Sequence, residues 1–250
     1  MSDLFMRDDA PLTEEEWEHL DSAVEGAARQ FLVGRHFIEL SGPFGEGAEV
    51  VPVGTGENRR QVPLQIIHSD FHLMWRDIAA NRRLHMPLDL GPAAQAAFAC
   101  ARAEDEKIFG ELLSLEGRNT VPLLDWSETG SPFQNVVDAT QALVEDGFFG
   151  PYAVILSPAL YNQTQRYGKG MRLESHLIAD VAKGGLFQSP VLKVDEGLVI
   201  SVGKFNLDLA IGQDLVTAYM GNEELTQLFR VFETIALRIK RPEAVCTFES

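Results

Sequence analysis

Three consecutive carboxylates, Glu104, Asp105 and Glu106, are the residues whose types and spacing could most directly do chemistry. Carboxyl groups crowded in or near a core have pKa values that are pushed apart, so they can serve as general acid and base or bind a metal ion. The alternative is a solvated helix face with one acid turned inward to a basic or backbone partner. The first interpretation would make the chain a hydrolase- or protease-like enzyme that also uses histidines.

The histidines give weaker evidence for a metal or catalytic site. His68 and His72 are four residues apart and would share one face of a strand, but the sequence offers no third ligand nearby. The six histidines are scattered over different predicted elements: His19, His36, His68, His72, His85 and His176. We therefore predict no metal site.

Familiar catalytic and nucleotide-binding motifs do not occur in the sequence. It contains no GxSxG, HExxH or GxGxxG motif, and the glycines around Lys169 lack the spacing of a phosphate-binding P-loop. The two cysteines, Cys100 and Cys246, show no CxxC spacing and are typical of buried thiols in a reducing compartment. Residue chemistry alone thus predicts no enzyme.

Composition bounds the class of protein and its partners. The chain has 250 residues, of which 45% are hydrophobic, so it can bury a core as one large domain or two closely packed ones. Its 21 basic and 37 acidic residues give a net charge of −16, which argues against nucleic acid or an anionic membrane as a partner. No run of eighteen apolar residues occurs and the first twenty are acidic and polar, so we expect a cytoplasmic protein.

The three acids lie in the longest segment that the periodicity predicts as a helix, Leu90 to Gly117. Gly91-Pro92 suits its first turn, Gly117 its end, and its apolar residues recur at three- and four-residue steps. The first half is nearly all alanine, so another element can approach it closely.

Upstream, the sequence predicts a helix from Thr13 to Gly34 that opens with a Thr13/Glu16 capping box. Alternation predicts a strand over Arg35–Leu40, and two extended arms, Val50–Val53 and Gln61–Trp75, predict a hairpin with a polar tip at 54–60. Downstream, we predict helices at 132–147, from 157 onward and at 173–183, and strands at 150–156, 191–194, 198–203, 207–211, 215–219, 228–240 and 244–248. The mixture indicates an α+β protein.

Several local patterns, taken in order along nearly the whole chain, resemble the encapsulin family, the nanocompartment shell proteins of bacteria and archaea. They are Met6–Thr13 with Trp17 and Asp21, Gly34–Phe37, Ser41–Gly45, Glu104–Gly110, Asp146–Tyr152, Ile211–Leu215 and Pro242–Ala244. The resemblance implies the α+β fold of tailed-phage major capsid proteins, with a peripheral domain, an extended loop and an axial domain. The matching ranges are 1–47 for the N-terminal arm, helix and peripheral strand, 48–77 for the extended loop, 78–131 for the peripheral spine helix, 132–201 for the axial domain and 202–250 for the C-terminal peripheral strands.

The resemblance also implies a structural function, in which the chain itself catalyses no reaction. Copies of the chain would assemble into a closed icosahedral shell of 60 subunits that encloses a cargo enzyme, such as a ferritin-like protein or a peroxidase. In this family a short targeting peptide of the cargo docks on the shell interior. The matching positions are Phe31, Arg35, Phe37, Glu39 and Phe232, whose aromatic floor and charged rim would suit alternating small apolar and basic residues. Phe31 and Phe37 could equally be core residues.

A second implied surface is the loop that lines the fivefold pore, here Arg166, Tyr167, Gly168, Lys169 and Gly170. Its basic residues, with Arg172, could favour anions, or they could face away into solvent. The segment between Val53 and Val62 is shorter than in the family pattern. Some members of the family bind a flavin against a tryptophan, and Trp75 lies close to the matching place but not clearly in register with it. Flavin at Trp75 is the one cofactor that the resemblance allows, and we otherwise predict none. A third reading, a phage-derived capsid subunit that packages nucleic acid, is disfavoured by the net charge.

Overall fold

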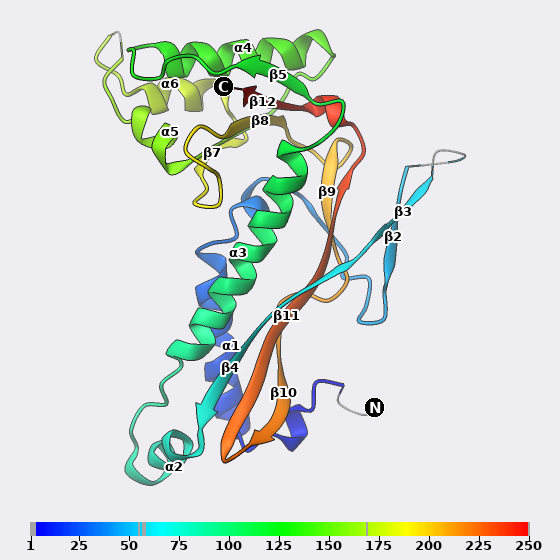
Figure 1. Cartoon of the computed structure of the whole chain (residues 1–250), viewed down its shortest axis with the longest axis vertical. Coiled ribbons are helices and arrows are strands. Elements are labelled where there is room, and N and C mark those ends of the chain that lie inside the picture. Colours follow the sequence, from blue (N-terminus) through cyan, green and yellow to red (C-terminus); the bar gives the residue numbers. More distant parts are fainter. Residues whose placement is uncertain (1–3, 55, 57–58, 169, 250) are drawn as a thin grey trace.

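The computed structural model describes residues 4–54, 56, 59–168 and 170–249, and it has the predicted α+β character. The chain forms two five-stranded sheets and a two-stranded hairpin (Figure 1). The helices are η1 (Arg7–Asp9), α1 (Glu14–Arg29), η2 (Gly34–His36), α2 (Trp75–Leu84), α3 (Gly91–Leu113), α4 (Ser131–Glu145), α5 (Pro158–Gln163), α6 (Glu174–Val181) and η4 (Pro242–Ala244). The strands are β1 (Leu40–Ser41), β2 (Val50–Val53), β3 (Arg60–Pro63), β4 (Gln65–Met74), β5 (Asn119–Pro122), β6 (Tyr152–Leu156), β7 (Gly185–Gln188), β8 (Gly197–Ser201), β9 (Leu207–Ile211), β10 (Val216–Glu223), β11 (Thr226–Ile239) and β12 (Val245–Glu249).

The first sheet is organised around the long strand β11. Its strand order is β1-β9-β11-β10, and β4 pairs with the other side of β11. Helices α1 and α3 pack on one face of this sheet, where the small residues of α3, from Ala93 to Ala101, let the helix approach closely. The predicted alanine-rich contact face is confirmed, with Leu20, Val24 and Phe229 in the same core cluster.

The second sheet has the order β5-β12-β8-β6-β7 and packs against α4, α5 and α6. Strand β6 is buried along its whole length, as its continuous apolar run predicts. The C-terminal half of α3 links the two sheets, because Ile108 and Phe109 share a core cluster with Ile200 of the second sheet and Ile235 of the first. One helix therefore fixes both sheets relative to each other.

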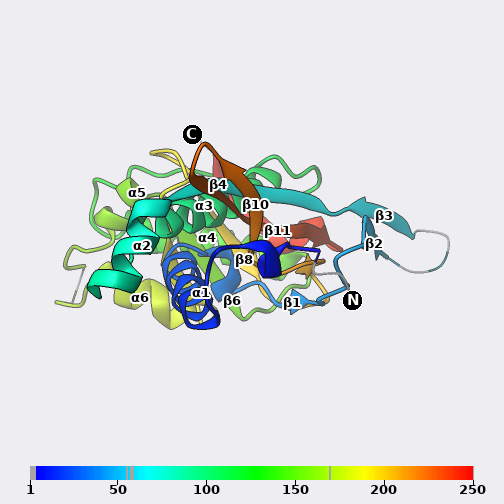
Figure 2. The ribbon, with the colours of Figure 1, turned by 90° about the horizontal axis from the view of Figure 1, so that it is seen from below.

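The hairpin of β2 and β3 projects from the body of the molecule (Figures 1 and 2). Val50 pairs with Pro63 and Val53 with Arg60, which confirms the predicted pairing. Of the predicted tip, residues 55, 57 and 58 lie outside the described residues. At its base, Val51 is buried against Ala210 and Ala236 of the first sheet.

Three predicted extended segments are wrong. Arg35–Leu40 is not a strand: it begins with η2, and the pairing that follows is limited to Leu40–Ser41. Gln61–Trp75 is not one arm, because it divides at Leu64 into β3, which pairs with β2, and β4, which pairs with β11. Residues 191–194 form no strand, and the prediction omitted β7, which pairs in parallel with β6. In each case the local pattern is compatible with a strand. Tertiary contacts decide whether the segment becomes a strand and which strand it pairs with.

The residue ranges expected as units of the capsid fold are divided differently between the sheets. The range 48–77 includes β4, which belongs to the first sheet, and the start of α2. The ranges 78–131 and 202–250 include β5 and β12, which pair in parallel within the second sheet. The chain therefore returns to the second sheet at its C-terminal end, where Phe248 packs against Trp126.

Candidate functional site

The three consecutive acids of α3 point to three different environments. Glu106 is exposed and pairs with Arg102 at 2.8 Å on the outer face of the helix. Asp105 is buried and accepts the backbone N–H groups of Val33 at 3.0 Å and Gly34 at 2.9 Å. Burial raises the pKa of Asp105 to about 7, against the lowering effect of these two backbone donors. Asp105 thus holds the turn that follows α1.

Arg35 gathers three carboxylates into one charge cluster, in which Glu104 and Glu233 are buried and Asp214 is exposed. Its Nε and Nη2 donate to Glu104 at 2.6–3.1 Å, its Nη2 also donates to Glu233 at 2.5 Å, and its Nη1 donates to Asp214 at 2.8 Å. The Arg35 side chain is 13% exposed, whereas those of Glu104 and Glu233 are fully buried. Burial and the neighbouring charge of Glu104 hold the pKa of Glu233 well above its usual range.

The arrangement is that of a structural network and not of an acid–base pair. Glu104 and Glu233 both accept from the Arg35 guanidinium, Asp105 accepts two backbone N–H groups, and these contacts join η2, α3 and β11. The predicted alternative, one acid turned inward to a basic or backbone partner, therefore describes Glu104 and Asp105.

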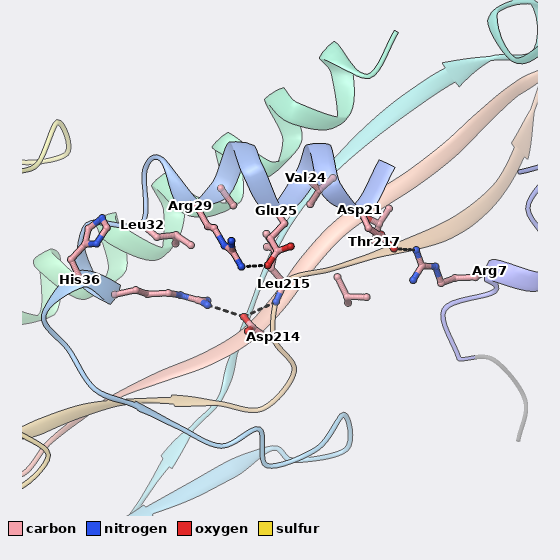
Figure 3. A pocket seen from close by; sticks show the side chains of 13 residues that line it. Arg7, Asp21, Val24, Glu25, Arg29, Leu32, His36, Asp214, Leu215 and Thr217 are labelled. Carbon is pink, nitrogen blue, oxygen red and sulfur yellow. Dashed lines mark hydrogen bonds and ion pairs between the residues drawn. The ribbon is translucent and has the colours of Figure 1, made fainter. Parts of the chain in front are cut away.

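A cavity of about 490 Å³ lies between α1 and the start of β10 (Figure 3). One wall is the apolar stripe of Val24, Ala28 and Leu32 on α1, and residues 215–217 form another wall. Three ion pairs surround it: Arg7–Asp21 at 2.5 Å, Arg29–Glu25, and Arg35–Asp214 at 2.8 Å. Since three cations face three anions, the lining carries no net charge from these residues.

The structure brings Arg35 to this cavity, but not the other four residues predicted to bind a cargo peptide. Phe31 packs edge-on against Phe98, with ring centroids 4.1 Å apart. Phe37 is buried against Phe109 and Phe187. These rings form no common aromatic floor, so the core-residue alternative describes Phe37, and Phe31 packs between helices.

Glu39 and Phe232 also lie apart from the cavity lining. Glu39 accepts the backbone N–H of Lys204 at 3.2 Å beside the first sheet. Phe232 packs edge-on against Phe5 of the N-terminal arm, with centroids 5.4 Å apart. Sequence reasoning missed the wall at 215–217; the signal available was the turn motif at 211–215, which ends where the cavity begins.

The predicted pore loop is held by one of its own arginines. The Arg166 guanidinium donates to the backbone carbonyls of Trp126, Ser127 at 2.7 Å and Gln163 at 2.9 Å. Arg172 pairs with Asp180 at 2.7 Å, and Gly168 donates its N–H to the Arg172 carbonyl. Lys169 lies outside the described residues.

The other two pore-loop positions differ in character. The Tyr167 ring is 71% exposed, and Gly170 adopts φ +91°, a left-handed conformation that favours glycine. The predicted set of free positive charges is therefore smaller than the sequence indicates, because Arg166 is committed to shaping the loop and Arg172 to an ion pair.

The histidine pair lies within β4, and Trp75 follows directly after that strand. Trp75 is the first residue of α2, 44% exposed, with the Arg76 guanidinium 5.6 Å from its ring centroid. His68 and His72 flank Asp70, whose carboxylate is taken by Arg230 at 2.6 and 2.8 Å. Within the described residues, no three His, Cys, Asp or Glu side chains are grouped to hold a metal ion, and no helix there is long and apolar enough to cross a membrane.

Comparisons with known proteins identify the family to which the chain is similar. The model of the Linocin_M18 family, described as "Encapsulating protein for peroxidase", matches residues 1–236. A curated relative from Myxococcus xanthus, named "Type 1 encapsulin shell protein EncA", is 43% identical over 279 aligned positions that cover 100% of this chain and 97% of the relative.

Solved structures show the same fold. A virus-like particle from Pyrococcus furiosus matches with a TM-score of 0.83 and 20% identity, over 95% of this chain and 100% of the other. The capsid of Myoviridae phage XM1 matches with a TM-score of 0.58 and 11% identity, over 84% and 88% of the two chains. The fold is thus that of tailed-phage major capsid proteins, and the family is one of structural shell proteins, not enzymes. The chain belongs to the encapsulin shell-protein family.

Proposed function

We propose that copies of this chain assemble into a closed icosahedral shell of 60 subunits that encloses a cargo enzyme of the peroxidase or ferritin-like type. The observation that carries the proposal is the full-length match to a type 1 encapsulin shell protein. The family description names peroxidase, and another relative is named a ferritin-like–encapsulin shell fusion protein. Two free, buried cysteines support a cytoplasmic nanocompartment, where thiols stay reduced.

The projecting hairpin supports assembly. A two-stranded ribbon is marginally stable by itself in water, and β2–β3 leaves the body of its own chain (Figure 2). We infer that it serves as the extended loop and lies on a neighbouring subunit. The first sheet with α1 and α3 would then form the peripheral domain, and the second sheet with α4, α5 and α6 the axial domain.

The axial domain would present the loop at 166–170 to the fivefold pore. In this proposal Arg166 shapes the loop through its three backbone carbonyl partners, and the exposed Tyr167 ring faces the opening. Replacement of Arg166 by Ala is then expected to change pore permeability through the shape of the loop more than through its charge.

We infer that the targeting peptide of the cargo docks in the cavity between α1 and β10. Its apolar wall and its ring of paired charges support a peptide with apolar side chains at the centre and polar ones at the rim. Of the residues first predicted for this role, Arg35 keeps a direct place at the rim. Phe31, Phe37 and Glu39 would act from behind it, by holding α1 and the turn after it in position.

The test of assembly is electron microscopy of the chain expressed alone, after size-exclusion chromatography at moderate salt. Uniform hollow spheres in the excluded fraction are the expected result. A monomer or small oligomer without spheres would overturn the shell proposal. The absorbance ratio at 260 and 280 nm of the same particles tests the nucleic-acid alternative, and a protein-like ratio is expected from the net charge of −16.

A further inference from the structure

Strand β10 presents a free backbone edge to the cavity. β10 pairs with β11 on one side, and on its other side the N–H of Tyr219 donates to the carbonyl of Phe5 at 2.9 Å. Backbone groups of residues two apart in a strand point the same way. The N–H and C=O of Thr217 therefore also point away from β11, and they have no backbone partner among the described residues.

The side chain of Thr217 adds a third unpaired group at the same place. Thr217 is fully buried within the chain, it lines the cavity, and its Oγ1 has no hydrogen-bond partner in the part of the chain that the structure describes. A buried hydroxyl without a hydrogen-bond partner is unfavourable, because it has lost its water and gained nothing in return. Thr217 thus brings three unpaired polar groups to the cavity that it lines, and one ligand could satisfy all of them; Figure 3 shows where its side chain lies among the lining residues.

The wall formed by α1 indicates which chemical groups such a ligand carries. Val24, Ala28 and Leu32 form an apolar stripe along α1, and the surrounding cations and anions are already paired with each other. A ligand that lies between this stripe and a strand edge needs backbone hydrogen bonds on one side and apolar side chains at every second position on the other. An extended apolar peptide has this chemistry.

We propose that the peptide docks by strand addition on the edge of β10, with Thr217 as the positioning residue that sets its register. This inference rests on the proposed cargo-binding function of the cavity and adds the conformation and side-chain pattern of the bound peptide. The free edge ends at Tyr219, where Phe5 of the N-terminal arm takes the next backbone site. Arg7, which pairs with Asp21 and lies 4.0 Å from the centre of the Trp17 ring, holds that arm in place.

The added strand is therefore short. From the C=O of Leu215, whose N–H already donates to the Asp214 carboxylate at 2.8 Å, to the point where Phe5 pairs, the edge offers room for roughly four peptide residues at ~3.3 Å per residue. Two of their side chains face α1 and two face away. Because the lining charges balance, binding should depend little on salt, in contrast to docking through basic side chains.

The experiment titrates assembled shells with a fluorescein-labelled, end-blocked peptide of alternating serine and leucine, followed by anisotropy. Two further peptides carry backbone N-methyl groups at alternate residues, one set on each parity. We expect saturable binding, a loss of at least tenfold in affinity for one N-methyl parity and less than twofold for the other. We also expect less than a twofold change between 50 and 500 mM NaCl.

The matched variants are Thr217→Val and Thr120→Val. Thr217→Val keeps the shape of the side chain and removes the unpaired hydroxyl, so the shell should form normally while the affinity falls about tenfold. Thr120, exposed on β5 in the second sheet, is the control, and its variant should bind as the unmodified shell does. Hydrogen exchange of the amides at 215–219 should slow when the peptide is bound.

Equal affinity for both N-methyl parities, together with unchanged binding by Thr217→Val, would overturn strand addition in favour of docking through side chains alone. Intact shells that bind no peptide of the panel, with unchanged exchange at 215–219, would overturn the docking site and leave the shell proposal standing. Absence of shells by microscopy would instead refute the proposed function itself.

Discussion

Replacing Arg35 with Met is the sharpest perturbation of the buried charge cluster. Met keeps an unbranched, apolar stem but removes the guanidinium that neutralises Glu104 and Glu233. Both of these carboxylates are fully buried, so water cannot take over from the lost cation. The variant therefore leaves two acidic side chains in the interior without their counter-charge.

The expected loss of stability follows from that burial. Breaking a buried ion pair by removing one partner costs about 3–5 kcal/mol. For a chain of this size, each 1 kcal/mol lowers the unfolding temperature by roughly 2–4 °C, so a fall of about 6–20 °C is expected. Because burial holds the pKa of Glu233 well above its usual range, protonation relieves part of the deficit in acid. The deficit should thus be smaller at pH 5 than at pH 8.

The assay is the thermal and guanidinium unfolding of purified assemblies, followed by tryptophan fluorescence at pH 5 and pH 8. Arg29→Met is the matched control, because Arg29 and its partner Glu25 are both exposed and such pairs contribute about 0–1 kcal/mol. The triple variant Arg35→Met, Glu104→Gln and Glu233→Gln removes all of the buried charge. It should recover most of the stability lost in the single variant.

The reasoning would be refuted by an Arg35→Met variant that unfolds within about 1 kcal/mol of the unmodified protein at both pH values. It would also be refuted by a triple variant no more stable than the single one, since the loss would then come from packing of the arginine stem and not from uncompensated charge.

Three further predictions concern single positions. Burial raises the pKa of Asp105 to about 7, so its protonated form stabilises the fold below its unfolded pKa of about 4, and that contribution is lost as the pH rises through 7. Asp105→Asn should therefore reduce the difference in the free energy of unfolding between pH 5 and pH 8, as measured by guanidinium titration. An unchanged difference between the two pH values would contradict the prediction. Burial raises the pKa of Cys100 and of Cys246 to about 12, so iodoacetamide at pH 8 should label neither thiol in native particles and both after denaturation, as read by mass spectrometry. Thr13→Ala should lower the free energy of unfolding by about 1 kcal/mol, because it removes the acceptor of the Glu16 N–H in the capping box, whereas Thr13→Ser should not.

Local signals in the sequence were sufficient for the elements that depend on local physics. The capping box at Thr13 begins α1 as predicted, and Ser157 caps α5 by accepting the N–H of Leu160. The long helix α3 was predicted four residues too far at its C-terminal end, since it ends at Leu113 and not at Gly117. The capsid-like fold was predictable because turn and strand-entry motifs recur in order along the chain.

The segment after α1 shows where local pattern fails. Arg35 to Leu40 alternates like a strand, but the carboxylate of Asp105, 71 residues from Gly34 in the sequence, accepts the N–H groups of Val33 and Gly34 and folds the segment into a turn. A Cβ on Gly34 would lie 2.8 Å from Ile108, so the close approach of α3 also selects the residue. Neither contact has a signature in the local sequence.

The sequence by itself determined the family, the membership of the three acids in one long helix, and the balance of charge that disfavours nucleic acid, because each of these is written in composition, periodicity or motif order. Tertiary structure alone decided that Arg35 turns toward buried carboxylates, that Phe31 and Phe37 serve helix packing, and that Thr217 lines a cavity. The physical reason is that burial and hydrogen-bond partnership are properties of surfaces brought together from α1, α3, β10 and β11, and residues far apart in the chain meet there.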